Sequence, residues 1–337
     1  MKRTWTAGEI LKFSNVHWEP LALQAAIQLG LFTALDELTQ PNESASIATV
    51  AEKLGCNPRA LEMLCSALIA LGFLSQTAQG LSLPESSRRY LSSQSKDYLG
   101  FIISHHAHLL KAWGGLAGSV MSGQAQPVET GDFRNEEERE AFLMGMFNIG
   151  THQAETIANR LSLESRGRLL DVGGGPGTYA IYFCLANPHL RATIFDRPST
   201  KPFATKVVEE HKLTERIDFV SGDFIKDALP TGYDVAWLSQ VLHGETPENA
   251  AALIKNAAAS LNPQGLLVVQ EFVLEDDRTG PPHSALFGLN MLVCTDGGQA
   301  YTWSEISQMM TDAGATSIKR LEVTLPEGCG IIVGTMG

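Results

Sequence analysis

A glycine-rich turn offers the clearest chemistry in the sequence, because residues 171–178 are DVGGGPGT. The apolar stretch RLLDV runs into this turn and a helical pattern begins at about Thr178, which predicts a strand, a loop and a helix in succession. Glycines in such a loop let backbone N–H groups approach a ligand at the helix N-terminus. Gly175, Gly177 and Ala180 also fit the dinucleotide pattern G-x-G-x-x-G/A, so the loop alone does not identify the ligand. A turn that serves only tight packing is the other alternative.

Three carboxylates, Asp171, Asp196 and Asp223, lie at or near the ends of three successive predicted strands. Asp196 follows the loop at about the 20-residue distance at which a carboxylate accepts ribose hydroxyls. Asp223 can accept an adenine amino group, with the ring of Phe224 near the adenine face. Such a cluster would repel a pyrophosphate and attract a cationic nucleoside sulfonium. Charge therefore favours S-adenosylmethionine (SAM) over NAD.

Three histidines close together, His105, His106 and His108, raise the question of a metal site. Only His105 and His108 fall on one face of a helix, and no carboxylate or cysteine nearby completes a ligand set. We therefore expect no metal, and either a lining role in a pocket or simple helix packing for these side chains.

The segments that must position the loop and the carboxylates alternate between strand and helix after Arg168. The stretches ATIFD, IDFVSGD, YDVAWLSQV and GLLVVQEFVL are strand-like, and helical stretches separate them. This alternation predicts an α/β domain over residues 166–337, a Rossmann-like, doubly wound parallel sheet with helices on both faces. Residues 317–323 and 330–334 are expected to close the domain as a hairpin.

The N-terminal part is predicted to be mainly helical. Apolar residues recur at helical spacing from Leu21 to Leu29, and Gly30 supplies a stop signal. Residues 49–54 and 58–70 resemble a helix-turn-helix, with a small β-wing at residues 74–83, which predicts a winged-helix-like domain over residues 1–95. Residues 96–165 are expected to form a helical linker with breaks near Gly114 and Pro127.

Composition excludes several classes of partner. The 337 residues carry 37 acidic and 25 basic side chains, a net charge of -12, without a basic stripe that could neutralise a phosphate backbone. The five cysteines are scattered and odd in number, which indicates free thiols in a reducing compartment. The sequence shows neither a membrane-span-length apolar run nor a signal peptide pattern. We expect a cytoplasmic protein that binds neither nucleic acid nor membrane.

As a set, the motifs resemble the class I SAM-dependent O-methyltransferases that include plant caffeate-type, acetylserotonin and bacterial natural-product enzymes of secondary metabolism. ALQAAIQLGLFTAL and TVAEKLGCNPRALEMLCSALIALGFL resemble the family's winged-helix dimerisation module. LLDVGGGPGTYA, ATIFDRP, RIDFVSGDF and the closing YTWSEISQMMTDAGA fit its later blocks in order and spacing. The resemblance covers nearly the whole chain and implies a homodimeric methyltransferase.

The resemblance also implies roles for residues of the cofactor site. Gly173, Gly175 and Gly177 would line SAM, Asp196 would hold its ribose, and Asp223 and Phe224 its adenine. Ser239 stands where the family often has a lysine or serine that touches the cofactor.

His243 falls on the family's catalytic histidine, and Glu271 matches the first of two acidic residues that flank it. The resemblance implies that His243 acts as general base and that Glu271 orients its ring and balances its charge. Two departures are visible: the usual His-Asp-Trp is here HGE, and residues 298–302, GQAYT, lack the second carboxylate. A capping or core histidine at the end of a strand is the alternative for His243.

Four residues match positions that often line the family's methyl-acceptor pocket: Phe142, Met146, Asn290 and Met291. Simple core packing is the alternative, because Met and Phe at helical spacing often serve only that. Phe13, His17 and Trp18 lie where a partner subunit's N-terminal segment commonly closes this pocket, or else they pack within a dimer interface. The acceptor class implied is a small aromatic or polyketide-like metabolite methylated on oxygen, with nitrogen and carbon acceptors left open.

The sequence leaves two other hypotheses about the protein's function open. The helix-turn-helix-like segment could belong to a transcription regulator, although the second helix carries little positive charge beyond Arg59. The altered HGE motif and the missing carboxylate could indicate a SAM-binding relative that catalyses a reaction other than methylation.

Overall fold

The computed structural model describes residues 4–41, 43–126 and 136–337. By contacts between residues, the chain divides into two compact units, residues 1–108 and 109–337. Each unit has its own hydrophobic core. Neither boundary expected from the sequence, at residue 95 or residue 165, coincides with this division, and the domain limits stay a prediction.

The first unit is mainly helical, with one short hairpin of antiparallel strands. Its elements in chain order are α1 (Ala7–Ser14), α2 (Trp18–Gln28), α3 (Leu31–Leu38), α4 (Ile47–Leu54), α5 (Pro58–Ala70), β1 (Ser75–Thr77), β2 (Gly80–Ser82) and α6 (Glu85–Leu91). The helix α7 (Gly100–Gly114) begins in this unit and ends in the second.

Local signals explain the winged-helix arrangement of α4, α5 and the β1–β2 hairpin. The Ser46 side chain accepts a hydrogen bond from the Thr49 N–H at the start of α4, and Gly55 ends that helix in the left-handed conformation at φ +64°. Asn57 caps α5 in the same way through the Ala60 N–H. Leu68 of α5 and Leu81 of β2 are fully buried in one core. The predicted helix-turn-helix and wing are thereby confirmed.

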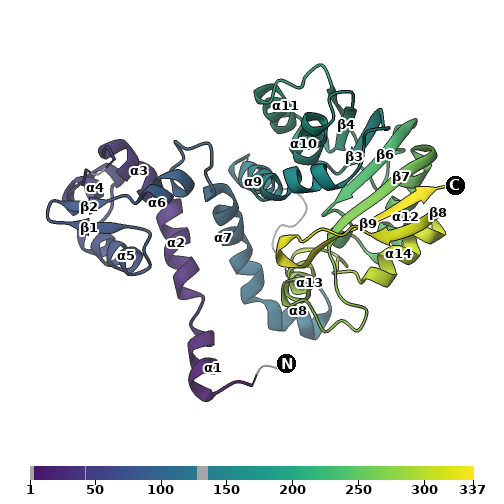
Figure 1. Cartoon of the computed structure of the whole chain (residues 1–337). Helices are drawn as coiled ribbons and strands as arrows, with labels where there is room; N and C mark the ends of the chain where they lie inside the picture. Colours follow the sequence, from purple (N-terminus) through teal and green to yellow (C-terminus); the bar gives the residue numbers. More distant parts are fainter. Residues whose placement is uncertain (1–3, 42, 127–135) are drawn as a thin grey trace. The chain divides into compact units, whose positions relative to one another are not determined.

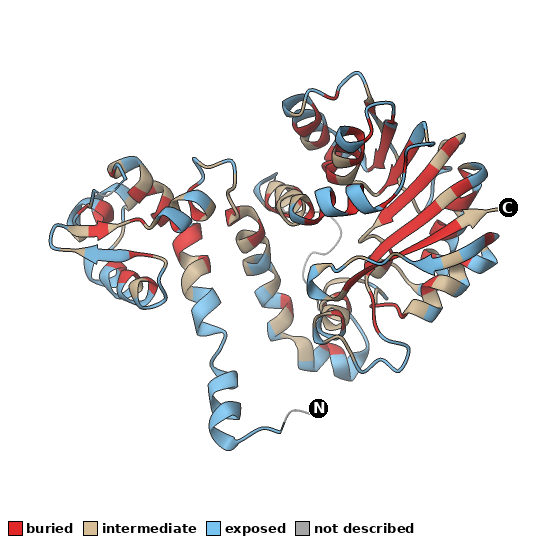
Figure 2. Cartoon of the chain, viewed as in Figure 1, coloured by how far each residue is buried: buried red, intermediate tan, exposed pale blue. Residues whose placement is uncertain are grey.

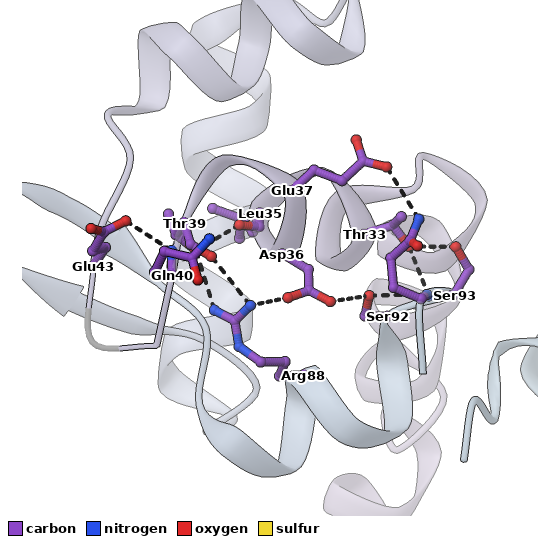
Figure 3. A network of polar contacts seen from close by, with 11 residues as sticks. Thr33, Leu35, Asp36, Glu37, Thr39, Gln40, Glu43, Arg88, Ser92 and Ser93 are labelled. Atoms are coloured by element: carbon purple, nitrogen blue, oxygen red, sulfur yellow. Dashed lines mark hydrogen bonds and ion pairs between the residues drawn. The ribbon is translucent and has the colours of Figure 1, made fainter. Parts of the chain in front are cut away.

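A polar network joins α3 to α6 in this unit (Figure 3). Arg88 forms an ion pair with Asp36, and the second oxygen of that carboxylate accepts a hydrogen bond of 2.6 Å from the Ser92 hydroxyl. Arg88 also donates to the Thr39 backbone carbonyl. The network holds α6, which follows the wing, against the end of α3.

The second unit contains the remaining elements. In chain order they are α8 (Leu116–Ser122), α9 (Glu136–Arg160), β3 (Arg168–Val172), α10 (Thr178–Ala186), β4 (Arg191–Asp196), η1 (Pro198–Thr200), α11 (Lys201–Glu210), β5 (Ile217–Ser221), β6 (Tyr233–Ser239), η2 (Leu242–Gly244), α12 (Pro247–Ala259), β7 (Leu261–Phe272), α13 (Pro282–Cys294), α14 (Trp303–Asp312), β8 (Ala315–Arg320), η3 (Pro326–Gly328) and β9 (Cys329–Met336).

These strands form one seven-stranded sheet in the order β5-β4-β3-β6-β7-β9-β8. The first five of these strands run parallel, and β9 is antiparallel to both β7 and β8. Residues of α9, α10 and α11 form a core on one face, and residues of α12 and α14 form a core on the other (Figure 1). The central strands are buried almost throughout (Figure 2). The expected doubly wound α/β fold and its closing antiparallel pair are therefore present.

Differences from the sequence expectations are small. The strand β7 begins at Leu261, four residues before the predicted stretch, and β8 ends at Arg320 instead of extending to residue 323. The expected helix break near Gly114 lies between α7 and α8, whereas the break at Pro127 falls outside the described residues. No single helix among the described residues is long and apolar enough to cross a membrane, and only the bent pair 7–28 with 31–38 passes by length and composition.

Candidate functional site

The candidate site residues gather at the carboxyl ends of the parallel strands. Strand order reverses between β3, which pairs with β4, and β6, and this switch point leaves a crevice in folds of this type. The glycine loop follows β3, Asp196 ends β4, and Glu271 lies near the end of β7. His243 lies in η2, four residues after the end of β6, and so beyond the strand end at which the sequence placed it.

The glycine loop is shaped by contacts on its inner side. Gly177 has φ +83°, and a Cβ there would come within 2.4 Å of the Ile194 side chain on β4. The positive φ favours glycine here, and any larger residue would also have to displace the end of the Ile194 side chain. Gly175 also has positive φ, at +55°, but nothing lies within 4 Å of where its Cβ would point. The loop is therefore packed tightly beneath Gly177 and open beside Gly175, where a ligand can approach the backbone.

Asp196 connects this loop to the end of β4. Its carboxylate accepts hydrogen bonds from the Gly175 N–H at 2.7 Å and the Arg197 N–H at 2.6 Å. The Thr200 hydroxyl donates a third at 3.2 Å. Burial raises the pKa of Asp196, and the backbone N–H donors lower it in part. A carboxylate has about four lone-pair sites, so one acceptor site remains free for a ligand unless one of the internal donors is displaced.

Asp171 lies near the end of β3 and is buried directly before the loop. One carboxylate oxygen accepts the Ala180 N–H at 3.3 Å, and the other is buried without a hydrogen-bond partner among the described residues. A Cβ on Gly174 would lie 2.6 Å from this carboxyl group. Burial, with a smaller contribution from the charge of Asp196, raises the pKa of Asp171 to about 7. The buried Asp171 carboxyl group therefore packs against the loop at Gly174 and holds the start of α10 through Ala180.

Asp223 and Phe224 come two and three residues after the end of β5. Asp223 accepts the Ile225 N–H at 3.0 Å and pairs with Lys226 at 3.3 Å. The Phe224 ring comes within 3.5 Å of where a Gly173 Cβ would lie, so this ring borders the glycine loop. The Ser239 hydroxyl turns toward Gln270 and donates to its side-chain oxygen at 3.0 Å.

The His243 imidazole is paired with the Glu271 carboxylate, with 2.7 Å between Nδ1 and Oε2. The other oxygen, Oε1, accepts the Leu242 N–H at 2.8 Å and the His243 N–H at 3.3 Å. A carboxylate only accepts hydrogen bonds, so the neutral imidazole tautomer that completes this contact carries its proton on Nδ1. The Nε2 lone pair is then the free base of the ring.

The segment that lacks the second carboxylate holds the backbone of this histidine. The Gln299 N–H donates to the His243 carbonyl at 2.9 Å, and a Cβ on Gly298 would lie 2.5 Å from the same oxygen. The Tyr301 hydroxyl donates to the Glu245 carbonyl at 2.8 Å. Residues 298–302 therefore fix the position of η2, whereas Glu271 fixes the ring.

The imidazole also makes an aromatic contact that the sequence did not reveal. The Phe287 ring meets the His243 ring edge-on with centroids 4.7 Å apart, and Phe272 lies 4.6 Å from Phe287. Phe287 is three residues before Asn290 on α13, so helical spacing from Asn290 was the signal that could have found it.

The sequence also did not predict a buried polar cluster next to Glu271. The Gln270 side chain donates to the Gln153 side chain at 3.3 Å and to the Cys329 sulfur at 3.2 Å. Gln240 donates to the same sulfur and holds a left-handed backbone at φ +57°, which is costly for a residue other than glycine. The glutamine within the apolar run VVQEF was the available signal.

The predicted acceptor-pocket residues lie on two helices. Phe142 and Met146 are one turn apart on α9, and Asn290 and Met291 are adjacent on α13. The Asn290 side chain accepts a hydrogen bond of 2.8 Å from the indole of Trp113, which the sequence gave no reason to single out. The lining role of all four stays a prediction.

Burial lowers the pKa of His105 in α7 to about 4, and the charges of His106 and His108 act in the same direction. Within the ranges that the structure describes, no three His, Cys, Asp or Glu side chains gather as metal ligands.

The fold and the site together define a Rossmann-like α/β protein with a glycine loop and a histidine–carboxylate pair on one edge of the sheet. The O-methyltransferase domain matches residues 123–316, and the O-methyltransferase dimerisation domain matches residues 11–93. The chain therefore belongs to the O-methyltransferase family.

Individual relatives extend along nearly the whole chain. The 3-hydroxy-5-methyl-1-naphthoate 3-O-methyltransferase of Streptomyces sahachiroi is 30% identical over 322 residues, 94% of this chain and 92% of that protein. The tetracenomycin polyketide synthesis 8-O-methyl transferase of Streptomyces glaucescens is 29% identical, covering 96% of both. Human N-acetylserotonin methyltransferase, solved in complex with SAM, superposes with a TM-score of 0.87 at 25% identity over 100% of both chains.

The buried Asp171 carboxyl makes stability depend on pH. Its folded-state pKa of about 7 lies above the ordinary value near 3.9. The folded protein thus binds more protons between about pH 4 and 7, and stability is lost as pH rises through that window. We predict that Asp171→Asn, without ligand, melts increasingly above wild type as pH is raised from 4 to 8.

Asp234→Asn provides a control of opposite sign. Burial alone would raise the pKa of Asp234, but the donors Asn262, Gly167 and Arg168 lower it overall. This variant should therefore melt below wild type at pH 8, and the deficit should shrink toward pH 3. Differential scanning calorimetry measures both series, and a melting difference for Asp171→Asn that does not change with pH contradicts the assignment.

Proposed function

We propose that the protein transfers the methyl group of SAM to an oxygen of a small aromatic or polyketide-like metabolite, with His243 as general base. The observation that carries the proposal is the 2.7 Å contact between His243 Nδ1 and Glu271, which leaves Nε2 as a free base. The acceptor class follows the relatives, whose names specify a naphthoate and a tetracenomycin polyketide. Such a reaction belongs to secondary metabolism, and a cytoplasmic location stays a prediction from the free cysteines.

SAM is the cofactor, and the residues present fit it. The open side of Gly175 leaves room for a ligand next to the backbone, whereas the packing beneath Gly177 keeps the loop rigid. We assign the ribose to the Asp196 carboxylate and the adenine to Asp223 and Phe224.

When bound, SAM supplies an electrophilic methyl group on a sulfonium. The protein must then align the acceptor oxygen with that methyl group and remove the acceptor's proton. His243 Nε2 takes the proton as charge leaves the oxygen, and Glu271 stabilises the imidazolium that forms, as an aspartate does in a catalytic triad. Gln299 and Gly298 keep the histidine backbone in place, so the single carboxylate of Glu271 suffices to orient the ring.

A SAM-binding protein that catalyses another reaction is the second candidate, favoured only by the HGE motif and by Ala300, which stands in the segment that lacks the second carboxylate. The helix-turn-helix segment lies within the matched dimerisation domain, which favours subunit association over DNA binding for this segment.

We further propose domain limits of 1–95 for dimerisation, 96–165 for a helical linker that contributes to the acceptor pocket, and 166–337 for SAM binding.

The first prediction concerns the cofactor. SAM and its product S-adenosylhomocysteine should bind and stabilise the protein, and NAD should not. Asp196→Ala should weaken SAM binding by about 1.5–3 kcal/mol, the range for hydrogen bonds to a charged group. The control Asp218→Ala alters an exposed carboxylate on β5 and should leave binding unchanged. Isothermal titration calorimetry measures all of these, and equal affinity for NAD would overturn the cofactor assignment.

A second prediction separates catalysis from binding. On a neutral phenolic acceptor, His243→Ala should keep SAM affinity and lower turnover by about 10²–10⁴-fold, the contribution of a positioned base. Glu271→Gln should lower it less, because this side chain acts through the ring. His189→Ala changes an exposed histidine that follows α10 and is the control. Formation of S-adenosylhomocysteine gives the rates, and a His243→Ala enzyme with full activity would reject the base.

The third prediction is a homodimer held by the N-terminal helices. No residue of α1 is buried in the single chain, and Leu11, Phe13 and Trp18 are each more than 60% exposed (Figure 2). Apolar side chains this exposed favour a protein interface. Light scattering should give the mass of a dimer at micromolar concentration, and Leu11→Glu with Phe13→Glu should shift it toward monomer. A wild-type monomer at that concentration is incompatible with the proposal.

A further inference from the structure

A groove lies between α11 and β5, the strand at one edge of the sheet. Its volume is about 270 Å³, just below the range of sites for drug-sized molecules, so it has room for a ligand with one aromatic ring. The floor is apolar, because Ile194, Val208 and Ile217 line it and are buried in the core on that face of the sheet. The partly exposed Phe219 ring borders the same floor.

Polar groups gather at the rim of this groove. Lys201 and Thr205 are four residues apart on α11 and share one face of that helix, and Thr214 lies in the turn before β5. Lys201 is exposed and forms no ion pair with any residue that the structure describes. A cation in the first turn of a helix faces the positive end of the helix dipole, so an anion bound there is favourable. Asp218 also lines the groove, but strand alternation turns its side chain to the face opposite Ile217.

Two residues of the floor also touch the glycine loop. A Cβ on Gly177 would lie 2.4 Å from the end of the Ile194 side chain and 3.9 Å from Val208. At the rim, Thr200 stands directly before α11, and its hydroxyl donates to the Asp196 carboxylate at 3.2 Å. The groove therefore shares side chains with the back of the candidate cofactor loop and adjoins the carboxylate that we assign to the ribose.

We propose that this groove is a second ligand site, which takes a small aromatic carboxylate, and that its occupant strengthens SAM binding through Ile194. The ring covers the apolar floor, and the carboxylate meets the Lys201 ammonium group and the Thr205 hydroxyl. A ligand that holds Ile194 in place also holds Gly177, and with it the loop in the shape that the cofactor requires. Such coupling is reciprocal, so bound cofactor also tightens binding in the groove.

The test uses 3-(4-fluorophenyl)propionate, which carries one ring and one carboxylate, and its neutral alcohol analogue. Fluorine NMR gives their affinities for the full-length protein with and without S-adenosylhomocysteine. We expect the carboxylate to bind about threefold more tightly than the alcohol, as one exposed ion pair allows. S-adenosylhomocysteine should raise the affinity of the carboxylate by at least about fivefold, the lower end of common coupling between sites.

Methyl NMR of the isoleucine δ1 groups locates the bound molecule. The Ile194 and Ile217 signals are assigned by their loss in Ile194→Val and Ile217→Val. Both signals should shift when the carboxylate is added to protein saturated with S-adenosylhomocysteine, because both side chains lie in the floor of the groove.

Three variants identify the groups responsible. Thr205→Trp fills the groove from an exposed position and should abolish binding, and Lys201→Gln should remove the preference for the carboxylate over the alcohol. Lys206→Gln is the matched control, because Lys206 is an exposed lysine of α11 outside the lining of the groove, and it should keep both properties. Circular dichroism and melting temperature establish that each variant is folded.

Several outcomes overturn the inference: no binding of the carboxylate, binding that leaves the Ile194 and Ile217 signals unshifted, or binding that persists in Thr205→Trp. Affinity for S-adenosylhomocysteine that is unchanged or lowered when the carboxylate is bound overturns the coupling. Because S-adenosylhomocysteine binding is measured on its own as well, a protein that binds it but not the carboxylate rejects this inference alone and leaves the methyltransferase function intact.

Discussion

The buried carboxylate of Glu271 is the group on which the arrangement of the site depends. It is 1% exposed, yet three N–H donors from residues 242 and 243 surround its two oxygens. Loss of these contacts would leave a charge buried without partners, which is strongly unfavourable. The carboxylate therefore ties the loop after β6 to β7, and the same contacts that satisfy its charge set the orientation of the imidazole.

Packing of the sheet makes this contact possible. Strand β9 pairs with β7 along its length, including Glu271 with Gly330, so the carboxylate projects from a strand held on both sides. At the ends of β3 and β4 the glycine loop is fixed by Gly177 against Ile194 and by Asp196 on the Gly175 N–H. The candidate cofactor loop and the candidate base are thus attached to adjacent strands of one rigid element, which limits the motion of either relative to the other.

Much of the fold and part of the candidate site could be predicted from the sequence, because the signals for them are local. The glycine loop, the capping of α5 by Asn57 and the alternation of strands and helices each depend on neighbouring residues. Family resemblance added His243 and Glu271, which the structure places 2.7 Å apart. The contact of Trp113 with Asn290 joins residues 177 positions apart, and no local pattern encodes it. The contact of the Asp171 carboxylate with the Ala180 N–H could not be predicted either, and the role of Asp171 toward the cofactor stays a prediction.

The central claim is that Glu271 holds His243 in the tautomer that carries its proton on Nδ1 and leaves Nε2 free. Nitrogen-15 NMR of the imidazole distinguishes protonated from bare ring nitrogens, and the His243 signals can be assigned by their loss in His243→Gln. With S-adenosylhomocysteine bound at pH 8, the account predicts a protonated Nδ1 and a bare Nε2. In Glu271→Gln, whose amide can also donate, this preference should weaken. A proton on Nε2 in the wild-type protein would contradict the account, because that nitrogen could not then accept the proton of the substrate.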